Sequence, residues 1–93
     1  MEPEHERLTI DEEPRRLLVT SEPYVIYNGW QYQPVVDVFE KKTRKEYYIY
    51  ISANSLSKAL ELLRGDNKGK MMGLEFWVHK EGPDKFAKFK VED

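Results

Sequence analysis

Hydrophobic and polar residues alternate along most of this chain, a pattern typical of strands buried on one face. The first such segment, residues 16–27, is rich in β-branched and aromatic residues, and Pro23 within it predicts a bend or an edge position. Two further strands are predicted over 30–40 and 45–51. The Asn-Gly pair at 28–29 predicts a tight type I′ turn between the first two segments, because that turn needs positive φ at both central residues.

The period of the hydrophobic pattern then changes from that of a strand to that of a helix. Spacings of three and four residues place four apolar side chains on one helical face: Leu56, Ala59, Leu60 and Leu63. Ser52, Asn54 or Ser55 is a candidate cap for the start of this helix. Gly65 lies where a left-handed C-terminal residue is expected.

Alternation returns over 73–80 and 85–92, and the turn sequence at 81–84 between them predicts a final hairpin. The element order is therefore β-β-β-α-β-β, which predicts an all-β fold with one helix. A five-stranded barrel of the OB type has this order, with the helix covering the open end of the barrel. An open α+β sheet carrying one helix has the same order, so the order alone does not choose between them.

Acidic residues are concentrated at the start of the chain. Residues 1–13 contain one base, Arg7, and the acids Glu2, Glu4, Glu6, Asp11, Glu12 and Glu13. The other fourteen basic and eleven acidic residues make the rest of the chain mildly basic, although the net charge is −2. We therefore expect a flexible acidic arm over 1–13 and one OB domain over 14–93. Leu8 and Ile10 alternate with polar residues, which allows a short strand within the arm.

The composition indicates a soluble, intracellular protein that does not act as an enzyme. No apolar run approaches the ~18 residues of a membrane span. The acidic start of the chain lacks the apolar segment of a signal peptide, so a cytoplasmic location is expected, in the host cell if the protein is viral.

The residue types needed for catalysis or metal binding are scarce. There is no cysteine, and the two histidines, His5 and His79, have no metal-ligand spacing. The loop at 65–70 contains glycine and lysine but lacks the spacing of a phosphate-binding loop. We therefore predict no catalytic residue, no metal and no cofactor.

Residues 47–91 resemble the second half of single-stranded-DNA-binding OB domains, of the small archaeal, viral or replication-protein-A-like types. The resemblance rests on the strand-to-helix passage at 51–56, the helix at 56–63, the segment 73–78 and the hairpin into 85–91. Residues 16–40 match only as a long hairpin. The resemblance implies a replication-type protein that binds single strands across the barrel face, with DNA favoured over RNA.

Single-strand binders combine exposed rings that stack on bases with cations that follow the phosphates. Alternation predicts which side chains lie opposite the core of each strand. The expected nucleic-acid-binding residues are the rings Trp77, Tyr48, Tyr50 and Phe86 and the cations Lys88, Lys90, Lys42, Arg44 and Lys70. In the second strand, either Trp30 and Tyr32 or Gln31 and Gln33 share this face, and the sequence leaves that register open.

Two other interpretations use the same exposed rings. One is an OB module that binds protein through the arm or the sheet face, for example as a small subunit of a replication or viral assembly. The other is a homodimer that buries the sheet face. The surroundings of Trp77 and Phe86 discriminate between partners: lysines there favour nucleic acid, whereas Asp37, Glu46 and Glu75 favour protein.

Overall fold

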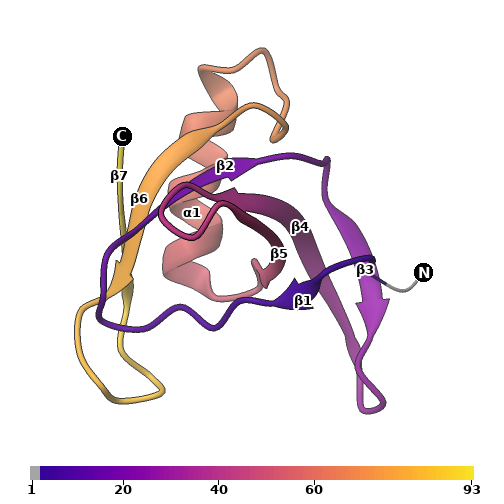
Figure 1. The fold of residues 1–93 in the computed structure, drawn as a ribbon, viewed down its shortest axis with the longest axis vertical. Helices are drawn as coiled ribbons and strands as arrows, with labels where there is room; N and C mark the ends of the chain where they lie inside the picture. The colour runs from indigo at the N-terminus through magenta and orange to yellow at the C-terminus, as the bar shows by residue number, and fades with distance from the viewer. Residues whose placement is uncertain (1–2) are drawn as a thin grey trace.

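The computed structural model of the chain describes residues 3–93 and contains one bent, strand-rich sheet and one helix (Figure 1). The elements are β1 (Glu6–Arg7), β2 (Arg15–Val19), β3 (Tyr24–Tyr27), β4 (Tyr32–Glu40), β5 (Lys45–Tyr50), α1 (Asn54–Gly65), β6 (Glu75–Lys80) and β7 (Phe89–Glu92). The strand order is β1-β5-β4-β2-β6-β7, with β3 also paired to β4. The expected mostly β fold with one helix is confirmed. Within residues 3–93 the sheet does not close, because no pairing joins β1 to β7.

The predicted first strand is divided by a bend. Both β2 and β3 pair antiparallel with the nine-residue strand β4, and Pro23 lies in the segment between them. A proline cannot donate to a strand ladder, which accounts for the break at this point. The predicted bend at Pro23 is thus confirmed.

The core lies on the inner side of the curved sheet, against the helix. Central strand β2 pairs with β4 on one side and β6 on the other, and its Leu17 and Val19 point inward. Helix α1 adds Leu56 and Leu60, which are fully buried as the helical pattern predicts. The remaining core residues are Leu8, Ile10, Val36, Val38, Ile49, Ile51, Met71, Leu74, Phe76 and Val78. No helix in residues 3–93 is long and apolar enough to cross a bilayer.

The predicted helix caps are wrong. Ala53 is the N-cap residue and makes no side-chain hydrogen bond, while Ser55 Oγ accepts the backbone N–H of Phe89 (2.9 Å) instead. At the other end, Asp66 rather than a left-handed Gly65 follows the last turn. The left-handed residues come later, at Lys68 and Gly69, because the chain makes further turns before it enters the next strand.

The predicted type I′ turn at residues 28–29 is also wrong. The loop spans residues 28–31, and Gly29 alone in it has positive φ (87°). The Asn28 side chain explains the wider loop, because its Oδ1 accepts the backbone N–H groups of Trp30 and Gln31 (both 2.9 Å). The second strand accordingly starts at Tyr32 and not at Trp30.

The N-terminal segment packs against the body of the protein. Strand β1 pairs in parallel with β5, and the Leu8 N–H donates to the carbonyl oxygen of Tyr48 (2.9 Å). Leu8 and Ile10 are buried in the core, and the Asp11 carbonyl accepts the N–H of Lys80 (2.7 Å). The segment 6–11 thus bridges β5 and β6. Residues 1–2 of the expected arm lie outside the described residues, and its flexibility stays a prediction.

Candidate nucleic-acid interface

A basic groove lies between the N-terminal segment, β5 and the loop that joins β6 to β7. It consists of two cavities of about 270 and 300 Å³, which share Lys85 and Phe89. The first is lined by Arg7, Leu8, Thr9, Ile10, Ile49, Tyr50, Lys80, Lys85 and Phe89. The second is lined by Ala53, Asn54, Ser55, Lys85, Phe86, Ala87, Lys88 and Phe89. Among residues 3–93, no acidic residue lines either cavity, although the chain has more acids than bases. We call this surface the basic groove.

One wall of the basic groove is built by the pairing of β1 with β5. This register places Arg7 beside Tyr48 on the outer face of the sheet. The Arg7 guanidinium carbon lies 4.1 Å from the centre of the Tyr50 ring, and the Tyr48 and Tyr50 rings are 6.1 Å apart and tilted by 58°. Guanidinium planes and tyrosine rings both stack on nucleic-acid bases. This wall therefore offers stacking surface and positive charge at one place.

The opposite wall is the loop between β6 and β7. Two hydrogen bonds to Asp84 fix the turn. Its side-chain carboxylate accepts the Phe86 N–H (3.0 Å), and its backbone carbonyl oxygen accepts the Ala87 N–H (2.9 Å). The Phe86 ring is 81% exposed, with Lys85 Nζ 5.0 Å from its centre. Lys88 is also exposed. The predicted strand over 85–92 is shortened to β7, because these turn bonds hold residues 84–87 in a loop.

The cations of the basic groove are not neutralised by carboxylates of the described part of the chain. Among residues 3–93, no ion pair within 4 Å involves Arg7, Lys80, Lys85 or Lys88. Instead, Lys80 Nζ lies 5.8 Å from the centre of the Phe89 ring. Free cations beside aromatic faces attract phosphates while the rings remain available for bases. The neighbouring cavity shares Thr9, Ile10 and Lys80 with the basic groove and is also lined by Asp11 and Glu12, which limits the basic groove on that side.

Trp77 lies at a different place, a cavity of about 340 Å³ that also contains Pro14, Lys41 and Lys42. Its indole is nearly half exposed, and the Arg16 guanidinium carbon is 5.8 Å from the ring centre. The charges around it have both signs. Glu75 binds Arg16 (2.8 Å) and Lys41 (3.6 Å), and Glu92 is the cross-strand neighbour of Trp77. The hydrogen bond from Arg16 is the main reason why the pKa of Glu75 is lowered.

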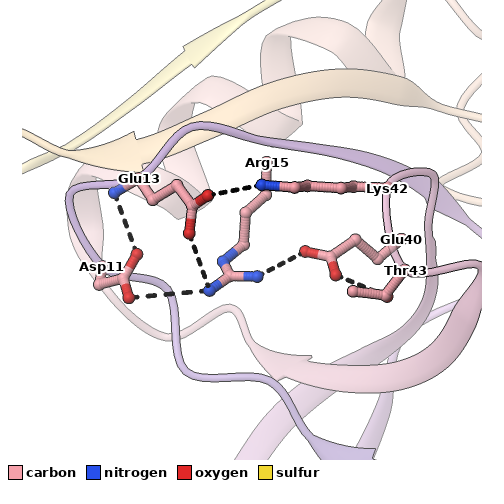
Figure 2. A network of polar contacts seen from close by, with 6 residues as sticks. All are labelled: Asp11, Glu13, Arg15, Glu40, Lys42 and Thr43. Atoms are coloured by element: carbon pink, nitrogen blue, oxygen red, sulfur yellow. Dashed lines mark hydrogen bonds and ion pairs between the residues drawn. The ribbon is translucent and has the colours of Figure 1, made fainter.

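Arg15 and Glu40, which line the Trp77 cavity, form an ion pair within a network of polar contacts. Figure 2 shows this network. Glu40 is fully buried and accepts hydrogen bonds from Arg15 Nη1 (2.6 Å) and from Thr43 Oγ1 (2.7 Å). Burial alone would raise the pKa of Glu40, but the hydrogen bonds from Thr43 and Arg15 outweigh it and lower the pKa. Asp11 and Glu13 approach the other end of Arg15, each 3.7 Å from Nη2.

The other predicted cations are dispersed or paired. Lys42 binds Glu13 (2.9 Å), and Lys90 lies 3.6 Å from Glu92. Arg44 occupies the turn between β4 and β5 with φ of 59° and lines a cavity of about 520 Å³ that includes Glu6 and Glu46. Lys70 is exposed in the loop between α1 and β6. The structure thus brings together Tyr48 with Tyr50, Phe86 with Lys88, and Trp77 with Lys42, but not the full predicted set.

Sequence reasoning missed four charged or aromatic residues of the basic groove: Arg7, Lys80, Lys85 and Phe89. Arg7 was assigned to a flexible acidic arm, although the alternation of Leu8 and Ile10 beside it indicated a strand. The other three flank the final turn, where the pattern does not show that the N-terminal segment packs against them.

The described residues contain no group of three or more His, Cys, Asp or Glu side chains arranged to hold a metal ion. Comparisons with protein-family models, with curated proteins and with solved structures found no match for this chain. The resemblance to single-stranded-DNA-binding domains therefore stays a prediction.

Proposed function

We propose that this chain is an OB-type protein that binds single-stranded nucleic acid, without catalysis, in the basic groove. The observation that carries the proposal is one groove that combines cations with the rings of Tyr50, Phe86 and Phe89. Within residues 3–93 these cations form no ion pair and no acidic residue lines the groove. Phosphates would follow Arg7 and the lysines, and bases would stack on the rings. DNA is favoured over RNA because of the resemblance described above.

The strand order supports the OB part of the proposal. If β2 and β3 are taken as two halves of one bent strand, β4 is the second strand, β5 the third, β6 the fourth and β7 the fifth. Helix α1 then lies between the third and fourth strands, as in OB folds. In such folds, oligonucleotides bind the face of strands two and three and the loops before strand two and before strand five.

The placement of the loops agrees with this geometry. Figure 1 shows the β3–β4 loop and the β6–β7 loop projecting on the same side of the ribbon, with β1 running between them. The basic groove lies along β5 and the β6–β7 loop, which correspond to the third strand and the last loop. Because Arg7 covers one face of the Tyr50 ring, a base stacking there would displace Arg7 or stack on its guanidinium.

The first test is the affinity for a labelled oligo-dT, measured by fluorescence anisotropy for the wild type and for Phe86→Ala. Loss of one stacking ring weakens binding by ~1–3 kcal/mol, so we expect the affinity to fall roughly 5- to 150-fold. Because Phe86 is exposed in a loop, the fold should be unaffected, which circular dichroism checks. Leu62→Ala, an exposed apolar residue on the helix, is the matched control and should bind like the wild type. Equal affinities of Phe86→Ala and the wild type would contradict the proposal.

The second candidate function is protein binding at Trp77. Its cavity is bordered by both Arg16 and Glu75, and alternating charges of this kind suit a protein surface better than a polyphosphate. The same anisotropy assay separates the two sites. If Trp77 also stacks on bases, as the sequence predicts, Trp77→Ala will weaken oligo-dT binding. Unchanged binding would show that Trp77 does not contact the nucleic acid and would favour protein binding at this cavity.

A further inference from the structure

Strand β3 has one free edge. Within residues 3–93 it pairs only with β4, and Val25 lies opposite Pro34. Pro34 has no N–H, and its carbonyl oxygen accepts the Ile51 N–H (3.0 Å), so the polar groups of Pro34 face β5. In an antiparallel ladder the residue opposite such a position directs its own N–H and C=O away from the partner strand. Val25, and Tyr27 two residues later, therefore present their backbone groups to the free edge.

The side chains around this edge form an exposed apolar patch. The exposed fractions are 52% for Val25, 58% for Tyr27, 84% for Trp30 and 73% for Tyr32, and the rings of Tyr27 and Tyr32 are 5.1 Å apart. We call these four residues the hairpin patch. Exposed apolar side chains are common on proteins, and so are exposed strand edges. Soluble proteins, however, normally protect such an edge with charged residues.

The part of the hairpin around the free edge carries no charge. Residues 23–36 contain no Asp, Glu, Lys, Arg or His, although charged residues make up 34% of the chain. A phosphate backbone or a charged peptide would find no complementary charge there. Two identical copies, each with a net charge of −2, would meet without like-charge repulsion at the contact.

We propose that the hairpin patch and the free edge of β3 bind a second copy of this chain in a two-fold symmetric dimer. The two-fold axis passes beside Ile26, so the two copies of β3 run antiparallel. Val25 of the first copy then lies opposite Tyr27 of the second, and Tyr27 of the first lies opposite Val25 of the second. Each of these pairs exchanges two backbone hydrogen bonds, because Val25 and Tyr27 both direct N–H and C=O outward. The residues with outward backbone groups lie one on each side of Ile26. This arrangement makes the edge self-complementary, as an isologous interface requires.

The area of the patch sets the expected strength of the dimer. A buried aromatic side chain contributes about 150–250 Å², so three largely exposed rings and a valine supply roughly 500 Å² per copy. Because Tyr32 lies on β4, one strand in from the edge, the area buried on both copies totals at most about 1,000 Å², at or below the lower limit of specific interfaces. The dimer is therefore weak and dependent on protein concentration. The dimer leaves the basic groove accessible, because the patch contributes no lining residue to it, but it occupies Trp30 of the β3–β4 loop.

Sedimentation velocity of the whole chain, from about 5 to 300 µM, tests the proposal over the range expected for a small interface. The wild type should change from monomer to dimer over this range. Val25→Pro removes the outward N–H but none of the bonds to β4, and an edge strand tolerates proline when its N–H faces solvent. The Val25→Pro variant should stay monomeric, with an unchanged midpoint of thermal unfolding. The control Val25→Thr keeps the N–H and the β-branched shape and should still dimerise.

Tyr27→Lys provides a second variant in case the proline alters the strand. It places a charge at an exposed position of the edge and should also prevent dimerisation. A wild type that stays monomeric at the highest concentration would overturn the proposal. So would dimerisation of Val25→Pro and Tyr27→Lys at the wild-type concentration, because association would then use another surface.

Discussion

At the scale of single residues, the buried pair of Arg15 and Glu40 is the most consequential polar contact. A buried carboxylate is costly unless it is paired and hydrogen-bonded. Here Glu40 receives one hydrogen bond from Arg15 and one from Thr43, and Lys42 adds favourable charge. Arg15 and Glu40 both line the Trp77 cavity. Because Arg15 begins β2 and Glu40 ends β4, their contact connects these two strands.

This pairing predicts that Glu40→Gln destabilises the protein near neutral pH. Removing one member of a fully buried pair costs about 3–5 kcal/mol, and we expect the lower end of this range because Arg15 keeps Asp11 and Glu13 at 3.7 Å. The pKa of Glu40 is lowered in the folded state from its ordinary value of 4.5, so its stabilisation is complete above pH 4.5. That stabilisation is lost as the pH falls through the lowered pKa. The difference between wild type and variant should therefore shrink in acid.

Urea unfolding at neutral pH and near pH 3 measures both effects. Glu92→Gln is the matched control, because its carboxylate is exposed and 3.6 Å from Lys90, and exposed pairs contribute about 0–1 kcal/mol. A Glu40→Gln variant as stable as the wild type at neutral pH would show that the pair contributes nothing. An equal loss at both pH values would show that the ionisation of Glu40 is not the cause.

At the scale of elements, the sequence predicted most strands and the helix, because their patterns are local. Leu56 and Leu60 repeat with helical spacing, and the core residues of β6 alternate as expected. The errors occur where a polar side chain binds a backbone group outside the predicted pattern. Asn28 accepts N–H groups within the hairpin loop, and Ser55 accepts the N–H of Phe89 in strand β7. Such bonds depend on contacts that a periodic pattern does not encode.

The candidate site was predicted only in part for a related reason. Tyr50, Phe86 and Lys88 were identified because each belongs to an alternating segment or a turn. Arg7 was not, since its place beside Tyr50 depends on the parallel pairing of β1 with β5, between segments some forty residues apart. Parallel pairing leaves no hairpin signal in the sequence.

The N-terminal segment gives the prediction that belongs to this scale. Leu8 is buried in the core, so Leu8→Ala should lower the free energy of unfolding by about 2–4 kcal/mol through lost burial and the cavity left behind. Thr9→Ala, at the exposed neighbouring position, should change it by less than about 0.5 kcal/mol. Urea unfolding of both variants provides the measurement. Equal stabilities would mean that the segment does not hold to the body in solution.

At the scale of the whole molecule, charge is distributed unevenly over a chain whose net charge is only −2. Carboxylates gather at Asp11, Glu12 and Glu13, and near Trp77 they pair with the neighbouring bases. The cations of the basic groove remain without carboxylate partners in residues 3–93. A field of this kind attracts a polyanion to one part of the surface even when the whole molecule is slightly acidic.

The salt dependence of oligo-dT binding tests most directly whether the basic groove binds phosphates. If Arg7, Lys80, Lys85 and Lys88 each neutralise one phosphate, log affinity should fall with log salt with a slope of about −2.8 for a single strand. Between about 50 and 200 mM salt the affinity for labelled oligo-dT, measured by anisotropy, should then fall roughly 50-fold. Lys85→Gln should reduce the slope by about 0.7. No binding at the lower salt, or binding that does not change with salt, would contradict the proposed function.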